Sequence, residues 1–196
     1  MVILAAGTSS RMGRPKLLLE WAGKTLVRRA AETALDSGAT QVILVSGPRD
    51  TEMRAELADL PVMVVHNPDY AEGMSTSLRA GLSAVSPDAE GAIIMLSDQP
   101  LLSSSVVCRL AATLRGSDAL IVQPRYGGAP GNPVGFHRSL FDALRSQSGD
   151  QGARALLRRR QADIDYIDID DAEMQQDIDT PEDFASLNQA ADRPNR

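Results

Sequence analysis

Short apolar runs alternate with amphipathic stretches along almost the whole chain. The apolar runs are three to five residues long and are bounded by Gly, Pro, Asp or Ser, which is typical of strands buried in a sheet. We expect strands at residues 2–5, 41–45, 62–65, 92–96, 119–122, 134–136 and 164–167.

Between these runs, apolar residues recur at the spacing of a helix that buries one face. A final helix is predicted to begin at Pro181, with Thr180 as its N-cap. Strands that alternate with helices favour a mainly parallel sheet covered on both faces, a Rossmann-like three-layer α/β sandwich. We expect the other helices at residues 26–35, 74–85, 106–114, 140–145 and 153–160.

Size and composition indicate one globular domain. The chain has 196 residues, 43% of them hydrophobic and 23% charged, so we expect one domain at residues 1–189 and a frayed polar tail at 190–196. The seven aromatic residues and the net charge of −6 argue against nucleic-acid binding. No apolar run approaches the roughly 20 residues that cross a bilayer, and no secretory signal is recognisable, so we expect a cytoplasmic protein without a membrane partner. Cys108 is expected to be a buried structural thiol.

Charge is distributed unevenly. Residues 1–29 carry six basic side chains against Glu20 alone, a balance of +5 that predicts an anionic ligand. Residues 163–183 carry ten acidic side chains and no Lys or Arg. Most of these acids are expected to form a solvated face, from which a subset could hold a divalent cation.

The segment after the first strand is rich in small and basic residues. It is not a Walker A loop, because five residues separate Gly7 from Gly13 and Arg14-Pro15 precedes Lys16. The middle glycine of the dinucleotide fingerprint is also missing. Small residues nevertheless let a backbone approach a base or a phosphate closely, and Arg11 and Lys16 supply positive charge. We therefore expect a polyphosphate-binding loop.

Two acidic residues are candidate ligands for a metal ion. Asp98 follows the apolar run 92–96, at the strand end where open α/β sheets place their chemistry. Carboxylates suit Mg²⁺, which takes one or two of them together with phosphate oxygens and water. Asp179 could complete the pair, and Asp177 is the second choice. The alternative for Asp98 is a turn or helix cap.

Two further segments are candidate binding elements. Ser75 and Ser77 follow Gly73 in the first turn of a predicted helix, where they could bind a nucleotide or serve only as caps. Residues 126–135 contain four Gly and two Pro, which predicts a loop that faces the substrate.

The segment Leu4–Lys16 resembles the L-A-x-G-x-S-x-R-M-G-x-x-K signature of the MobA-like nucleotidyltransferases. Further matches cover nearly the whole chain, and their order resembles the molybdenum cofactor cytidylyltransferase branch. They are Gly73-Met74-Ser75-Thr76-Ser77-Leu78, Asp98-Gln99-Pro100, Gly131-Asn132-Pro133, Gly149-Asp150-Gln151-Gly152-Ala153-Arg154 and Asp177-Ile178-Asp179-Thr180-Pro181-Glu182-Asp183.

This resemblance implies a fold of the nucleotide-diphospho-sugar transferase type and transfer of CMP from CTP to a molybdopterin-type cofactor. It implies Mg²⁺ held by Asp98 and Asp179, and catalysis by Arg11, Lys16 and Asp98. The implied acceptor-binding residues are Asn132, Gln151 and Arg154. The expected nucleotide-binding residues are Leu4, Ala5, Ala6, Gly7, Ser9, Arg11, Lys16, Gly73, Ser75, Ser77, Asp98 and Gln99.

The substrates and partners leave alternatives open. The sequence Leu-Ala-Ala-Gly at residues 4–7 favours cytosine, because guanylyl members resemble Leu-Ala-Gly-Gly. Guanylyl transfer to the same cofactor and cytidylyl transfer to a sugar or polyol phosphate are the enzymatic alternatives. A non-catalytic nucleotide-binding or cofactor-binding protein, or a member recruited to redox chemistry, is the alternative from another class. A molybdoenzyme or its chaperone is a candidate recipient of the product.

Overall fold

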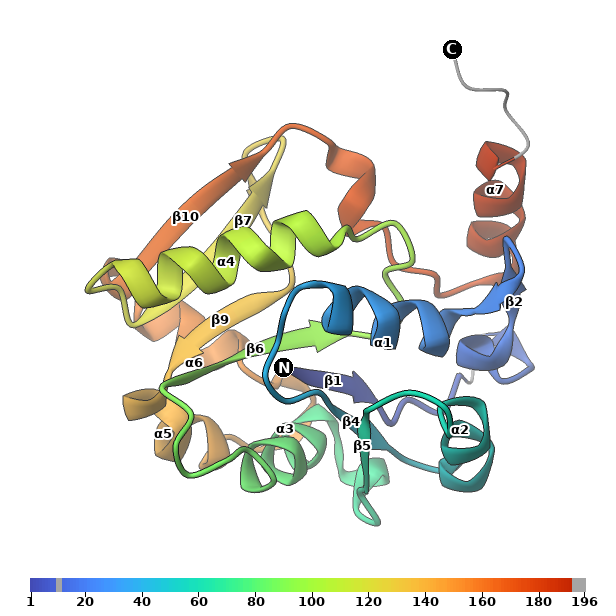
Figure 1. The fold of residues 1–196 in the computed structure, drawn as a ribbon, viewed down its shortest axis with the longest axis horizontal. Coiled ribbons are helices and arrows are strands. Elements are labelled where there is room, and N and C mark those ends of the chain that lie inside the picture. The colour runs from blue at the N-terminus through green and yellow to red at the C-terminus, as the bar shows by residue number, and fades with distance from the viewer. Residues whose placement is uncertain (10–11, 192–196) are drawn as a thin grey trace.

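A central sheet of eight strands organises the computed structural model, which describes residues 1–9 and 12–191 (Figure 1). Seven strands follow one another across the sheet in the order β10-β7-β9-β6-β1-β4-β5, and β8 pairs with β7. The strands of this sheet are β1 Val2–Ala5, β4 Ile43–Ser46, β5 Met63–His66, β6 Gly91–Leu96, β7 Ile121–Tyr126, β8 Ala129–Pro130, β9 Val134–His137 and β10 Ile164–Ile169.

The sheet is mainly parallel, as the sequence predicts. Strand β1 pairs in parallel with β4 and β6, β4 pairs in parallel with β5, and β10 pairs in parallel with β7. Strand β9 is antiparallel to both β6 and β7 and joins the two parallel groups. The carboxyl ends of β1, β4, β5 and β6 therefore share one edge of the sheet.

Helices cover both faces of the sheet, which confirms the three-layer architecture (Figure 1). Helices α1, α2 and α4 pack on one face and α3, α5 and α6 on the other. Their bounds are α1 Leu26–Asp36, α2 Asp50–Glu56, α3 Met74–Ser83, α4 Ser104–Gly116, α5 Phe141–Arg145 and α6 Arg154–Arg159.

The alternation of side chains along each strand builds the two cores. Ile3 and Leu44 face the core under α1, α2 and α4, whereas Val2, Ile43 and Val45 face the core under α3, α5 and α6. All five side chains are completely buried. Strands buried on both faces read as continuous apolar runs, which is why the sequence identifies them.

The last helix, α7 (Pro181–Ala191), packs away from the main sheet. Its Leu187 joins Leu26 and Ile178 in a separate apolar cluster, and Trp21 and Phe184 border this cluster. Trp21 belongs to a small hairpin of β2 (Glu20–Trp21) and β3 (Lys24–Thr25), which lies beside α7 in Figure 1. This cluster fixes the segment that leads into α7, where Asp179 lies.

Two expectations about local structure are wrong. Cys108 is exposed rather than buried, and its Sγ lies 3.4 Å from the Ser37 carbonyl oxygen. The buried stripe of α4 consists of Val106, Val107 and Leu110, and position 108 is rotated off it. Residues 126–135 are not a continuous loop: β7 extends to Tyr126 and turns through two glycines into β8.

The predicted end of the domain differs by two residues from the end of the last helix. Helix α7 continues to Ala191, and residues 192–196 of the expected tail lie outside the described residues. Within the described part of the chain, no helix combines the length and apolar character needed to cross a membrane.

Candidate functional site

The predicted polyphosphate-binding loop that follows β1, called the glycine-rich loop below, and Asp98 both begin at the carboxyl edge of the sheet. Leu4 lies one residue before the end of β1, and its carbonyl oxygen accepts hydrogen bonds from the backbone N–H of Ser97 at 3.3 Å and from the Ser97 hydroxyl at 2.8 Å. Ser97 is buried and immediately precedes Asp98. The ends of the neighbouring strands β1 and β6 therefore bring the loop and the carboxylate to one place, as the sequence predicts.

Lys16 links the two predicted metal ligands. Its Nζ lies 2.8 Å from Asp98 Oδ2 and 2.8 Å from Asp179 Oδ1. The Lys16 side chain is 11% exposed, against 21% for Asp98 and 34% for Asp179. The structure thus brings together three residues that are 82 and 163 positions apart in the sequence.

Lys16 is a permanent positive charge in this site. Burial lowers its pKa, but the carboxylates of Asp98 and Asp179 together outweigh burial and raise the pKa above its ordinary value of 10.5. The ammonium group therefore stays protonated at neutral pH.

The carboxylates fit a hard divalent cation. Asp98 Oδ1 is buried and has no hydrogen-bond partner, so one oxygen next to Lys16 is unused within the chain. No group of three or more His, Cys, Asp or Glu side chains suited to a metal occurs among residues 1–9 and 12–191. A pair of carboxylates is nevertheless sufficient for Mg²⁺ when substrate phosphates complete the coordination.

Asp177, the second choice as a ligand, contacts Gln99. Gln99 Nε2 donates to Asp177 Oδ1 at 2.9 Å. Burial, followed by the negative charge of Asp98, raises the pKa of Asp177. The same segment contains a backbone hydrogen bond of 2.9 Å from the Ile178 N–H to the Asp98 carbonyl oxygen.

The glycine-rich loop borders a cavity of about 290 Å³. Ser9 closes the loop, because its hydroxyl accepts the backbone N–H of Lys16 at 3.2 Å. The turn after β4 packs closely against the start of this loop: a Cβ atom at Gly47 would lie only 2.7 Å from the Ala6 carbonyl oxygen. The same turn lines the cavity with Pro48 and Arg49, and Arg14 lines it as well. The catalytic candidate Arg11 lies outside the described residues.

Arg49, which lines this cavity and pairs with Glu52 at 3.0 Å, is not among the residues predicted from the sequence. Its position after β4 could have indicated that it lies near the site, because the carboxyl end of β4 shares an edge of the sheet with the glycine-rich loop.

The serines of α3 are engaged in contacts within the protein. Ser75 is 1% exposed, and its hydroxyl donates to the Gly149 carbonyl oxygen at 2.7 Å. The hydroxyl of Ser77 accepts from Asn67 Nδ2 at 3.0 Å. Gly73 has a φ of +114°, and a Cβ atom there would lie 2.6 Å from Asp150 Oδ1. The start of α3 is therefore packed against residues 149–152.

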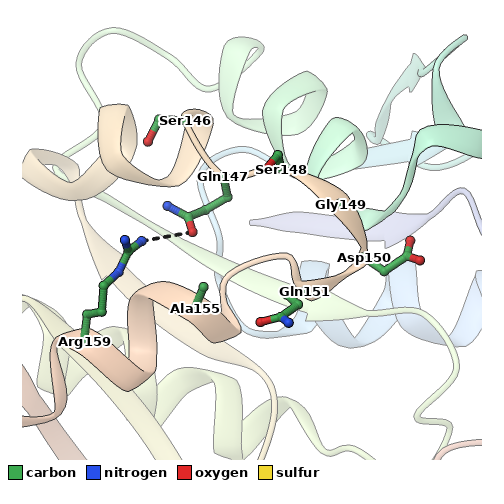
Figure 2. Close-up of a pocket in the computed structure, with 8 residues that line it drawn as sticks. All are labelled: Ser146, Gln147, Ser148, Gly149, Asp150, Gln151, Ala155 and Arg159. Carbon is green, nitrogen blue, oxygen red and sulfur yellow. Dashed lines mark hydrogen bonds between the residues drawn. The ribbon is translucent and has the colours of Figure 1, made fainter.

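One of the three acceptor candidates lines a cavity of about 580 Å³ between α5 and α6 (Figure 2). Gln151 lies in its wall and accepts a hydrogen bond from Arg158, while Arg159 donates to Gln147 across the cavity at 3.2 Å. Arg154 is exposed at the start of α6. Asn132 lies elsewhere, between β8 and β9, where its carbonyl oxygen accepts the Tyr126 hydroxyl at 2.7 Å.

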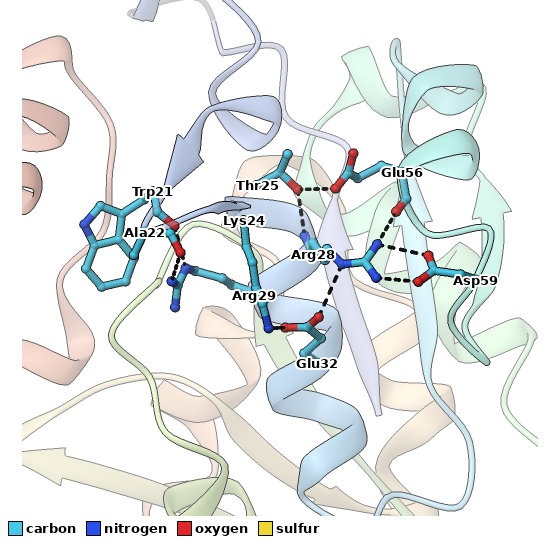
Figure 3. Close-up of polar contacts among 9 residues, drawn as sticks. All are labelled: Trp21, Ala22, Lys24, Thr25, Arg28, Arg29, Glu32, Glu56 and Asp59. Atoms are coloured by element: carbon cyan, nitrogen blue, oxygen red, sulfur yellow. Dashed lines mark hydrogen bonds and ion pairs between the residues drawn. The ribbon is translucent and has the colours of Figure 1, made fainter.

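Half of the basic residues in the first 29 positions serve the structure rather than a ligand (Figure 3). Arg28 forms a two-pronged contact with Asp59 and also donates to the Glu56 carbonyl oxygen. Lys24 pairs with Glu32, and Arg29 lies over the Trp21 ring at 4.2 Å. The +5 balance therefore overstates the charge available to an anion.

A family model described as the MobA-like NTP transferase domain matches residues 1–164. The chain belongs to the MobA-like NTP transferase family. It is 33% identical over 190 residues to the molybdenum cofactor cytidylyltransferase of Escherichia coli (strain K12), with 96% of this chain and 94% of that protein covered.

Members of this family differ in their named activities. The chain is 36% identical to nicotine blue oxidoreductase of Paenarthrobacter nicotinovorans, over 95% of this chain and 94% of that protein. The Rv0371C protein of Mycobacterium tuberculosis H37Rv, solved in complex with manganese, superposes with a TM-score of 0.81 and is 30% identical. That comparison covers 96% of this chain and 97% of the mycobacterial one. This MobA-like chain is a nucleotidyltransferase by family.

Asp183 holds the segment on which Asp179 lies. Its Oδ2 accepts the backbone N–H groups of Asp179 at 3.0 Å and Thr180 at 2.8 Å, while Thr180 Oγ1 accepts the Asp183 N–H at 3.2 Å. This reciprocal arrangement is a capping box, and it confirms Thr180 as the cap of α7.

We expect Asp183→Ala to lower the free energy of unfolding by about 1 kcal/mol at pH 7, the usual cost of losing a cap. The hydrogen bonds from the Asp179 N–H and from Thr180 lower the pKa of Asp183 below its ordinary 3.8. The stabilisation is therefore present above pH 3.8 and is lost as the pH falls through the lowered pKa. Urea unfolding at pH 7 and at pH 2.5 measures this difference. Glu182→Ala, in the same helical turn, is the control; an equal loss in both variants would contradict the capping role.

Proposed function

We propose that the chain transfers CMP from CTP to the terminal phosphate of a molybdopterin-type cofactor and releases pyrophosphate. The observation that carries the proposal is the position of Lys16 Nζ between Asp98 and Asp179, next to a glycine-rich loop. Cytosine and the molybdopterin-type acceptor are supported by the sequence motifs and by the Escherichia coli relative.

In this reaction an oxygen of the acceptor's terminal phosphate attacks the α-phosphorus of CTP. A new P–O bond forms, the bond from the α-phosphorus to the bridging oxygen breaks, and pyrophosphate leaves with that electron pair. No covalent intermediate with the protein is needed. The main requirements are alignment of the two phosphates and stabilisation of their negative charge.

The chain supplies charges of both signs for this purpose. Asp98 and Asp179 would hold Mg²⁺, which neutralises phosphate charge when bound. The Lys16 ammonium stabilises charge on the α-phosphate and on the leaving pyrophosphate, with Arg11 as its expected partner from the same loop. On the acceptor side, the forked donors of Arg154 suit a phosphate. Asn132 and Gln151 are the other acceptor candidates, and they lie in different parts of the structure.

The direct test is pyrophosphate release by the purified chain with CTP, Mg²⁺ and molybdopterin-type cofactor. Release that requires all three supports the proposal, and the cytosine dinucleotide product should be identified by mass spectrometry. Release with GTP but not CTP would indicate guanylyl transfer. Oxidation or reduction of the cofactor without pyrophosphate release would instead indicate the redox alternative.

We expect wild-type kcat/KM to favour CTP over GTP by about 10-fold to 200-fold, the effect of one methyl group in a tight pocket. The methyl group in question is that of Ala6, which is 7% exposed in a loop held against Gly47. Ala6→Gly should reduce the ratio of the two kcat/KM values.

Loop stiffness is the competing explanation for a residue at position 6, and it would change stability rather than the ratio. Thermal unfolding of Ala6→Gly separates the two explanations. A ratio that is unchanged in the variant would remove Ala6 as the cause, and a wild-type preference for GTP would overturn the assignment of CTP.

A further inference from the structure

We propose that Gln99 is a positioning residue that sets the distance between the carboxylates of Asp98 and Asp179. It does so by binding the segment before Asp179 rather than by contacting the nucleotide. This inference rests on the proposed function, because it assigns the pair of carboxylates to a divalent cation. The side chain of Gln99 is 5% exposed, which leaves little of it accessible to a substrate.

The contacts of the Gln99 amide determine its orientation. Nε2 donates to Asp177 Oδ1 at 2.9 Å and to the Gln175 carbonyl oxygen at 3.2 Å. A carbonyl oxygen and an ionised carboxylate can only accept, so the NH₂ end of the amide must face them. This leaves Gln99 Oε1 buried without a partner. Burying an oxygen without a hydrogen-bond partner costs free energy. The two hydrogen bonds that Gln99 donates are therefore the contacts that explain a glutamine at this position.

A backbone hydrogen bond adds a third connection between the same two segments. The Ile178 N–H donates to the Asp98 carbonyl oxygen at 2.9 Å, and the Ile178 side chain is fully buried with Leu26 and Leu187. Three hydrogen bonds thus hold residues 98 and 99 against residues 175, 177 and 178, and we call this arrangement the clamp. Asp98 is at one end of this clamp and Asp179 follows directly at the other.

The clamp has a consequence for metal binding. Asp98 comes from the end of β6 and Asp179 from a segment near the C-terminus, so no single element fixes their separation. Outer residues that orient metal ligands typically change metal affinity or activity 10- to 100-fold when they are replaced. Gln99 is suited to this role because its two donated hydrogen bonds, to the Gln175 carbonyl oxygen and to Asp177, connect the two ligand-bearing segments.

The test measures Mn²⁺ binding to the full chain, with the metal alone as the probe and the electron paramagnetic resonance signal of free Mn²⁺ as the readout. Gln99→Met keeps the side-chain length and removes both donated hydrogen bonds. We expect it to raise the Kd for Mn²⁺ by about 10- to 100-fold. Gln41→Met is the matched control, because Gln41 also donates to a backbone carbonyl, that of Ala84 at 3.1 Å, but precedes β4 at the opposite edge of the sheet.

A second pair of variants tests the hydrogen bond between Gln99 and Asp177 from its other end. Asp177→Asn and Asp177→Ala both remove the negative charge, but only asparagine retains an oxygen that can accept the Gln99 hydrogen bond. We expect Asp177→Asn to bind Mn²⁺ on the order of tenfold more tightly than Asp177→Ala. Equal Mn²⁺ affinities in the two variants would overturn the positioning role. This pair remains informative if Gln99→Met fails to fold.

The outcomes distinguish this inference from the function on which it rests. If the wild-type chain binds no Mn²⁺ even with CTP present, the metal assignment in the proposed function fails and the inference fails with it. If the wild type binds Mn²⁺ and Gln99→Met binds it equally well, only the inference fails. A selective loss in Gln99→Met with unchanged binding in Gln41→Met supports it.

Discussion

Asp98→Asn and Asp179→Asn are each expected to lower kcat for pyrophosphate release by at least about 1,000-fold, or roughly 4 kcal/mol of transition-state stabilisation. Each substitution preserves the volume of the side chain and removes one negative charge that faces Lys16. Neither aspartate belongs to the apolar cores, so the fold should persist. Steady-state kinetics with CTP and cofactor at saturating Mg²⁺ provide the measurement.

Asp165→Asn is the matched control for this loss, since Asp165 is an exposed acid on β10. Its kcat should remain that of the wild type. Thermal unfolding of all three variants verifies that they are folded. Near wild-type turnover in Asp98→Asn or Asp179→Asn would show that the residue concerned is not a metal ligand.

The fold is readable from the sequence because its strands are buried on both faces. Val2 and Ile3 face opposite cores and are both apolar, so a short uninterrupted run marks the strand. Helix α2 is not predicted by the pattern of apolar residues. Within Asp50–Glu56 only Met53 is buried, which leaves no apolar repeat to detect.

It is harder to predict from the sequence which residue a side chain contacts than which helix or strand the side chain belongs to. Arg28 and Lys16 both belong to the basic N-terminal region, yet Arg28 pairs with Asp59 and Lys16 with two carboxylates from distant parts of the chain. Local charge counts cannot separate these cases. The position of Asp98 after a strand is a general topological signal, whereas the contact of Gln99 with Asp177 depends on tertiary packing.

Lys16→Met is expected to lower kcat by about 100- to 1,000-fold, the usual effect of removing one preorganised charge or donor from a transition state. Because the pKa of Lys16 is raised above its ordinary 10.5, wild-type turnover should show no loss from its deprotonation near neutral pH. Arg14→Ala is the control from the same loop. Arg14 is exposed and lies 5.7 Å from the Phe184 ring, so its removal should lower kcat less than Lys16→Met does. Equal losses of kcat in both variants would indicate that the loop acts only as a general basic patch.

The same lysine variant should affect metal binding in the opposite direction. In the structure the Lys16 ammonium bridges Asp98 and Asp179, so a cation that binds between these carboxylates without nucleotide must compete with it. Methionine at this position leaves the two negative charges without that neutralisation, which strengthens their attraction for a divalent ion. We therefore expect Lys16→Met to bind Mn²⁺ alone more tightly than the wild type while it turns over more slowly. Weaker Mn²⁺ binding in this variant would mean that Lys16 organises the two carboxylates instead of competing with the metal.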